Sequence, residues 1–290
     1  MMNTRTKGYL IGAVAAAAYG MNPLFALPLY ADGMTPASVL LFRYLVAIAI
    51  IWCMIHFEGG SFATSRRNGF QLVVMGVLMA ISSITLFASY RYMDAGIAST
   101  LLFVYPILVA VIMAVFFREK ATASMTLCIV LAIAGIGLLY KASDGTTIDA
   151  TGTALVMVSA LSYAIYIVAV NQTSLRSLSS LVVTFYVLVY GAVLLAGMAL
   201  ADGSISLPGH WYMWGNVVAL ALFPTAISFA GTTKAIQYVG STPTAVLGAL
   251  EPLTAVFFGV TVFGEKLTVR DCIGIVLIIT AVTIVVTRRR

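Results

Sequence analysis

Long runs of hydrophobic residues follow one another along almost the whole chain, separated by short polar or glycine-containing segments. A helix needs about 20 apolar residues to cross a bilayer. The runs are continuous rather than alternating, which excludes a transmembrane β-barrel. The pattern therefore predicts an all-α polytopic membrane protein whose ten transmembrane helices cover residues 8–30, 36–57, 69–91, 95–117, 122–140, 151–171, 178–200, 211–238, 242–263 and 268–287.

The composition narrows the possible classes of protein. The 290 residues are 61% hydrophobic and only 9% charged, with a mean hydropathy of +1.05. Soluble domains are about 45–50% apolar and about 25% charged. Ten spans leave no room for a soluble catalytic domain, and the sequence has no HExxH, GxSxG, Walker A or GxGxxG pattern. We therefore expect neither an enzyme nor a nucleic-acid-binding protein, and we expect no cofactor or metal.

The distribution of Lys and Arg predicts the orientation of the chain. With the N-terminus inside, 11 basic residues fall on inner segments and 4 on outer ones, and Arg43 lies within span 2. Basic residues collect on the cytoplasmic side of bacterial membrane proteins. Both termini are therefore predicted to be cytoplasmic.

An internal repeat divides the chain. A shift of 146 residues gives seven identities over positions 92–122, among them Pro106 with Pro252 and Thr122 with Thr268. The two threonines are also predicted to be helix N-caps. Shifts of 144 and 142 pair Tyr19 with Tyr163 and Ser38 with Ser180. The chain is thus predicted to consist of two five-helix halves, residues 1–145 and 146–290.

Because five is an odd number, the second half enters the membrane from the opposite side. Inverted repeats of this kind are the architecture of many secondary transporters, which bind their substrate near the bilayer midplane where the repeats meet. This arrangement favours a transporter over the other classes of membrane protein.

Two motifs carry a resemblance to a known family. Glu251-Pro252 within span 9, and Phe263-Gly264-Glu265-Lys266-x-Thr268 at its exit, resemble the drug/metabolite transporter superfamily in its ten-helix EamA-type branch. Within that branch the chain is most similar to bacterial inner-membrane amino-acid exporters, including the aromatic amino-acid exporters. The resemblance implies a basket in which helices 1, 3, 4, 6, 8 and 9 line a central cavity while helices 5 and 10 lie at the periphery. Members of the family move amino acids, other metabolites, sugars and drugs.

Four prolines lie well inside spans 1, 4, 8 and 9. A proline has no N–H and leaves the carbonyl four residues earlier without its helical partner. In lipid, such a carbonyl must be satisfied by protein or by a watery cavity. We interpret these prolines as bends that surround the cavity and act as gates, the alternative being static kinks satisfied by neighbouring Ser or Thr: Pro23, Pro106, Pro224 and Pro252.

Three charged residues are predicted within the membrane. Glu251 lies near the middle of span 9, where a carboxylate costs at least about 2.5–3.5 kcal/mol. It is interpreted as a site for a proton or a substrate ammonium, with an anchor for helix packing as the alternative. Lys234 either points inward, toward a substrate carboxylate or Glu251, or extends to the cytoplasmic interface. Arg43 in span 2 is expected to extend outward to the interface, because span 2 is peripheral in the family.

Polar and aromatic residues at mid-depth complete the predicted site. A pocket of hydroxyl groups and aromatic faces suits a small zwitterion with an apolar side chain. The alternative for each residue is packing between helices, since Ser, Thr and Tyr form hydrogen bonds across helices without a ligand. The candidates are Tyr19, Asn22, Ser83, Phe87, Tyr90, Ser99, Phe103, Tyr163, Tyr166, Thr225 and Ser228, with Lys234 and Glu251.

The sequence therefore predicts a secondary transporter that exports amino acids and related small metabolites across a bacterial inner membrane by alternating access. Its partners would be the substrate and the lipid bilayer, and a monomer is compatible with the sequence. One alternative is a cation or multidrug exporter of the same fold, in which Glu251 binds the positive charge. Another is a membrane assembly protein that transports nothing.

Overall fold

The computed structural model describes residues 3–93, 95–118, 123–139, 150–201, 205–262 and 269–287, and this part of the chain is helical apart from short connections. Seven helical segments are long and apolar enough to cross a membrane, and three shorter apolar helices lie within spans 4, 5 and 10. The polytopic helical fold is thus confirmed. The predicted N-caps Thr122 and Thr268 and the exit motif 263–268 lie outside the described residues.

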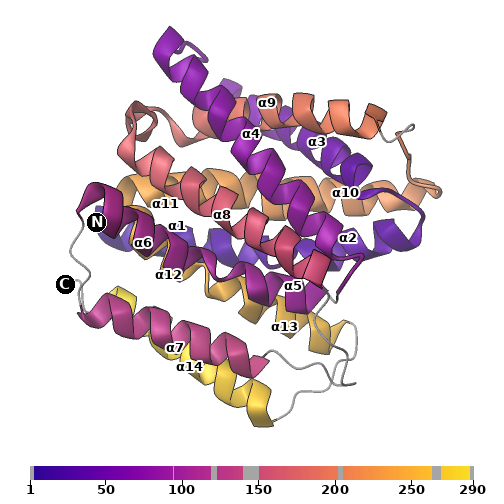
Figure 1. Cartoon of the computed structure of the whole chain (residues 1–290). Helices are drawn as coiled ribbons and strands as arrows, with labels where there is room; N and C mark the ends of the chain where they lie inside the picture. Colours follow the sequence, from indigo (N-terminus) through magenta and orange to yellow (C-terminus); the bar gives the residue numbers. More distant parts are fainter. Residues whose placement is uncertain are drawn as a thin grey trace.

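The helices follow one another along the chain in the order shown in Figure 1. The first half comprises α1 (Thr4–Tyr19), α2 (Asn22–Ala31), α3 (Pro36–Phe57), α4 (Arg66–Ser89), α5 (Ala95–Leu102), α6 (Tyr105–Phe117) and α7 (Ala123–Leu139). The second half comprises α8 (Ala150–Gln172), the 3₁₀ turn η1 (Ser174–Ser177), α9 (Ser180–Ala201), the 3₁₀ turn η2 (Trp211–Met213), α10 (Trp214–Ala221), the π-helical segment η3 (Leu222–Ile227), α11 (Ser228–Val239), α12 (Ser241–Leu247), α13 (Leu250–Thr261) and α14 (Val269–Thr287).

Spans 1, 4, 8 and 9 are interrupted next to their prolines. Pro23 and Pro106 fall in the first two positions of α2 and α6, where a missing N–H breaks no helical bond. Pro252 lies in the first turn of α13, and Pro224 lies in the π-helical segment η3. π-Helical segments are rare and are frequent at functional sites.

Two carbonyls four residues before these prolines have acquired other donors. The Thr225 hydroxyl donates to the Leu220 carbonyl over 2.7 Å. The Glu251 N–H donates to the Gly248 carbonyl over 2.9 Å. These carbonyls of spans 8 and 9 are therefore satisfied by groups of the same span.

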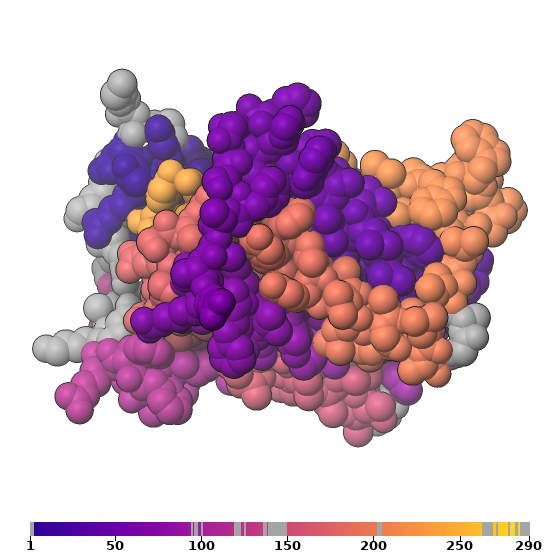
Figure 2. All heavy atoms as spheres, turned by 90° about the horizontal axis from the view of Figure 1, so that it is seen from above, coloured from indigo at the N-terminus to yellow at the C-terminus, as the bar shows by residue number. Residues whose placement is uncertain are grey.

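The helix–helix contacts of one half are repeated by the equivalent helices of the other half. Helix α7 lies along α14, its counterpart in the second half, and α3 lies along its counterpart α9. The contact between α4 and α8 is matched by the contact between α11 and α1. In Figure 1 the α7–α14 pair forms one edge of the bundle, as the family resemblance implies for helices 5 and 10. The interrupted helices lie between this pair and α3, α4 and α9, whose atoms form much of the middle of the face seen in Figure 2.

Close contact between α4 and α9 depends on Gly76. A Cβ atom at this position would lie 2.6 Å from Cβ of Tyr190 and 3.0 Å from the Val187 carbonyl oxygen. Overpacking of this kind costs about 1–3 kcal/mol. We therefore expect Gly76→Ala to lower the Tm of the purified protein in detergent.

Gly69 in the same helix provides the matched control. A Cβ atom there would meet nothing within 4 Å. Gly69→Ala should leave Tm unchanged or raise it, because alanine stabilises a helix by roughly 0.5–1 kcal/mol relative to glycine. Equal Tm values for the two variants would contradict the packing that we describe.

Candidate functional site

A buried carboxylate lies where interrupted spans of the two halves meet. Glu251, at the start of α13, is 5% exposed. The Tyr105 hydroxyl, at the start of α6, donates a hydrogen bond of 3.2 Å to its Oε1 atom. Among the described residues no basic side chain forms an ion pair with Glu251. The site thus contains a carboxylate with a single hydroxyl partner and no counter-charge.

Aromatic rings from both halves surround this carboxylate. The ring of Tyr163 packs edge-on against that of Tyr105, with centroids 4.8 Å apart, and is stacked on Tyr19 at 6.1 Å. Tyr166 is also stacked on Tyr163, at 6.3 Å, and Phe229 contacts Tyr19. We call these five rings, together with Glu251, the tyrosine cluster.

Two contacts in the tyrosine cluster join residues that the internal repeat relates. Tyr105 and Glu251 are separated by 146 residues, the shift that aligns the two halves at this point. Tyr19 and Tyr163 are separated by 144, the shift that aligns spans 1 and 6. Equivalent positions can touch only where they lie close to the pseudo-two-fold axis between the repeats. The tyrosine cluster is therefore at the centre of the repeat interface, where inverted-repeat transporters bind substrate.

Arg43 does not extend to the membrane interface, and that expectation was wrong. Its side chain is 0% exposed and points into the bundle from α3. Nε donates to the Thr225 hydroxyl, Nη1 to Oδ1 of Asn22 over 2.8 Å, and Nη2 to the Pro224 carbonyl over 3.0 Å. Two residues of η3 and the first residue of α2 supply these acceptors, so the guanidinium is hydrogen-bonded inside the bundle.

The rings of two phenylalanines complete the surroundings of Arg43. The guanidinium carbon lies 5.4 Å from the ring centroid of Phe87 and 5.7 Å from that of Phe229, within the range of cation–π attraction. Phe229 also contacts the rings of Tyr19 and Tyr44. Arg43 and the tyrosine cluster therefore share aromatic neighbours.

Most of the other predicted site residues lie in this central region. Ser83 shares a hydrogen bond of 2.8 Å with the Tyr44 hydroxyl, and Tyr166 shares one of 3.2 Å with Thr233. Ser228 is buried at the start of α11. Tyr90 packs against Phe87, and Ser99 on α5 lies beside Tyr90.

Lys234 does not join the site. Its ammonium nitrogen lies 5.0 Å above the ring of Tyr238, one turn further along α11. Among the described residues it forms no ion pair with Glu251. The sequence left two interpretations for Lys234, one pointing inward and one extending to the interface. Its position on Tyr238 agrees with a side chain that extends toward the end of the helix.

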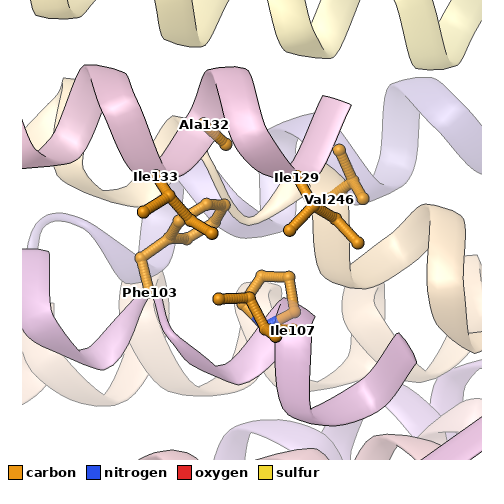
Figure 3. A pocket seen from close by; sticks show the side chains of 7 residues that line it. Phe103, Ile107, Ile129, Ala132, Ile133 and Val246 are labelled. Atoms are coloured by element: carbon orange, nitrogen blue, oxygen red, sulfur yellow. The ribbon is translucent and has the colours of Figure 1, made fainter. Parts of the chain in front are cut away.

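Phe103 lies at the edge of the tyrosine cluster. Its ring contacts that of Tyr105 at 5.7 Å and also lines a small apolar hollow between α6, α7 and α12. Figure 3 shows Ile107, Ile129, Ile133 and Val246 pointing into this hollow. The hollow has no polar lining residue, whereas the tyrosine cluster and Arg43 carry the polar chemistry.

The central region is closed in this structure. The side chains of the tyrosine cluster, Arg43 and Asn22 are buried and in mutual contact. The centre of the bundle is therefore closed to solvent in this structure.

A charged contact joins the loops that follow α2 and precede η2. Nδ1 of His210 lies 2.6 Å from Oδ1 of Asp32, and the N–H groups of Gly209 and His210 donate to Oδ2 at 2.6 and 3.4 Å. The hydrogen bond from His210, aided by those N–H groups, lowers the pKa of Asp32 below its usual value.

This contact should make stability depend on pH. Because the pKa of Asp32 is lowered in the folded state, its stabilisation is present above the unfolded value of about 3.9 and is lost as the pH falls through the folded pKa. We expect Asp32→Asn to lower Tm at pH 7, and the difference from wild type to shrink below about pH 4. Thermal unfolding across pH measures this, with Glu58→Gln as the exposed control. A difference that stays constant with pH would contradict the contact.

These features define a class of protein: a ten-helix membrane protein of two inverted halves with interrupted spans and a polar, closed centre. The sequence pattern of the EamA-like transporter family matches residues 6–141 and again residues 150–287. The chain therefore belongs to the EamA-like transporter family, and it is a membrane transporter.

Similar proteins agree on this class. An "uncharacterized transporter" of Archaeoglobus fulgidus is 28% identical over 76% of this chain and 77% of its own. An "uncharacterized inner membrane transporter YicL" of Salmonella typhimurium is 21% identical, covering 98% and 96% of the two chains. A solved crystal structure superposes with a TM-score of 0.81 at 18% identity, over 97% of this chain and 98% of the other, which shows the shared fold.

Proposed function

We propose that this transporter exports amino acids, including aromatic and apolar ones, and related small metabolites across the bacterial inner membrane. The observation that carries the proposal is the buried carboxylate of Glu251 within the tyrosine cluster, on the interface between the two halves. An ionisable group at this depth in a membrane protein marks a substrate or ion pathway.

The chemistry of the tyrosine cluster suits an amino acid. A substrate ammonium group would pair with the Glu251 carboxylate and be attracted to the faces of neighbouring rings. The rings of Tyr19, Tyr163 and Phe229 offer apolar surface to an apolar or aromatic side chain. Hydroxyl groups of Ser83, Ser99 and Ser228 lie within the same central region.

The proposed movement is alternating access. The halves 1–145 and 146–290 would rock about the tyrosine cluster, and the interruptions at Pro23, Pro106, Pro224 and Pro252 would act as hinges of the gates. A short interruption allows two helical segments to change their relative angle with few altered backbone dihedrals. Both termini would lie in the cytoplasm, on the side rich in basic residues.

A cation or multidrug exporter is the second candidate, because Glu251 would bind a positive charge equally well. The same assay separates the two. If the site accepts amino acids, an unlabelled amino acid would compete with the labelled substrate more strongly than an organic cation would. If the site accepts organic cations, the order would be reversed.

The experiment is transport by the purified chain in proteoliposomes, with labelled phenylalanine and leucine and with and without a pH gradient. Saturable flux that unlabelled amino acids block is the expected result. Inhibition by organic cations alone would favour the multidrug exporter. No flux of either class in folded protein would overturn the transport proposal and favour an assembly role.

A further inference from the structure

Arg43 is a buried cation whose three hydrogen-bond acceptors are neutral. Its three acceptors are the Thr225 hydroxyl, the Asn22 side-chain oxygen and the Pro224 carbonyl, and none of them carries a charge. Among the described residues no carboxylate forms an ion pair with it. A charge that is buried and unpaired is costly, so such groups usually pair with one another or face a substrate pathway.

The donors around Arg43 exceed the acceptors that the protein offers them. A guanidinium carries five N–H groups, and three of them are used in these hydrogen bonds. The Nδ2 amide of Asn22 is buried and has no partner, while Oδ1 of the same group accepts from Arg43. Unused donors of Arg43 and Asn22 thus occur side by side. A carboxylate, which only accepts hydrogen bonds, is the group that would satisfy them.

A second unpaired charge, of opposite sign, lies nearby. Within the described part of the chain, Glu251 has the Tyr105 hydroxyl as its partner and forms no ion pair with a cation. Phe229 contacts both the Arg43 guanidinium and the ring of Tyr19. Tyr19 is stacked on Tyr163, which packs against Tyr105, the hydrogen-bond partner of Glu251. The two charged groups therefore flank the same tyrosines without neutralising one another. A zwitterion with a carboxylate at one end and an ammonium at the other is complementary to this arrangement.

We propose that Arg43 and Asn22 form a subsite for the substrate α-carboxylate, opposite an ammonium subsite at Glu251. This inference rests on the proposed function and names the chemical class within it: free α-amino acids rather than amines, amides or cationic drugs. An organic cation would meet the like charge of Arg43, and an amine without a carboxylate would leave the donors of Arg43 and Asn22 unpaired. Arg43 is thus assigned a role in specificity.

The test is the ratio of the dissociation constants of phenylalaninamide and phenylalanine, measured by calorimetry on the purified protein. The two ligands share the ammonium group and the ring but differ in the carboxylate. Loss of a buried, hydrogen-bonded charge pair costs roughly 30-fold or more in affinity. We expect Arg43→Gln to lower the ratio by about that factor, while Arg91→Gln, an exposed arginine on the loop after α4, leaves it unchanged.

The outcomes are distinguishable. If Arg43 only holds η3 in place, Arg43→Gln weakens both ligands equally and the ratio stays at the wild-type value, which overturns the subsite but leaves the transporter proposal intact. If the wild-type chain neither binds nor transports phenylalanine, the proposed function itself fails. Should Arg43→Gln not fold, Asn22→Asp gives the same test, because its carboxylate would occupy the Arg43 guanidinium and lower the ratio in the same way.

Discussion

Glu251→Gln should abolish the part of amino-acid flux that a pH gradient drives, in a protein that melts like the wild type. Glutamine has the size of glutamate and still offers an oxygen to the Tyr105 hydroxyl, so the packing of α6 against α13 is retained. It can neither carry a proton nor pair with an ammonium group. We expect kcat/KM for phenylalanine to fall roughly 30-fold or more, as when one partner of a buried charge pair is removed.

The measurement is initial flux in proteoliposomes, with and without a pH gradient. Glu58→Gln provides the control, because Glu58 is exposed at the end of α3 and contacts no part of the tyrosine cluster. Wild-type flux in Glu251→Gln, with the gradient dependence retained, would assign Glu251 to helix packing. If the variant keeps the flux that does not depend on the gradient, Glu251 would serve proton coupling and not binding of the substrate ammonium group.

Gly248→Ala should eliminate transport by a different route. Gly248 lies between α12 and α13, and a Cβ atom there would collide with the Tyr105 hydroxyl and would lie 2.7 Å from Cζ of the same ring. The ring would have to leave Glu251. We expect a destabilisation of about 1–3 kcal/mol, seen as a lower Tm, together with loss of amino-acid flux.

A second substitution tests whether the collision is the cause. Tyr105→Phe in the Gly248→Ala background removes the nearest atom, so it should restore part of the lost Tm without restoring flux, because Glu251 still lacks its hydroxyl partner. Gly215→Ala in α10 is the control, since a Cβ atom there meets nothing within 4 Å. Normal flux in Gly248→Ala would show that contact between Tyr105 and Glu251 is dispensable.

The fold could be predicted from the sequence because hydropathy and proline act locally. Ten apolar runs give ten spans. A proline inside a span cannot take part in the regular helical hydrogen bonding, and the interruptions in spans 1, 4, 8 and 9 lie at or next to Pro23, Pro106, Pro224 and Pro252. The π-helical form of η3 was not predicted, and neither was the hydrogen bond by which Arg43 and Thr225 join two spans that are distant in sequence.

The centre of the protein was only partly predictable for the same reason. Arg43 was expected at the interface because span 2 is peripheral in the family. Its acceptors come from α2 and η3, which are distant from it in sequence, so local reasoning could not find them. Tyr105 was not among the predicted site residues, although the repeat contained a signal for it. The position aligned with Glu251 under the shift of 146 is Tyr105, and residues on the axis of an inverted repeat meet their own equivalents.

The contact between equivalent residues of the two halves has a consequence for how the halves came to differ. In an assembly of two identical five-helix chains, the position on the axis would have to hold the same residue twice. Two glutamates there would repel one another, and two tyrosines would leave no carboxylate at the centre. Joining the halves in one polypeptide frees each copy to diverge, so a donor and an acceptor can face each other across the axis. A single chain with two different halves can therefore pair Tyr105 with Glu251, whereas a symmetric dimer of identical halves cannot.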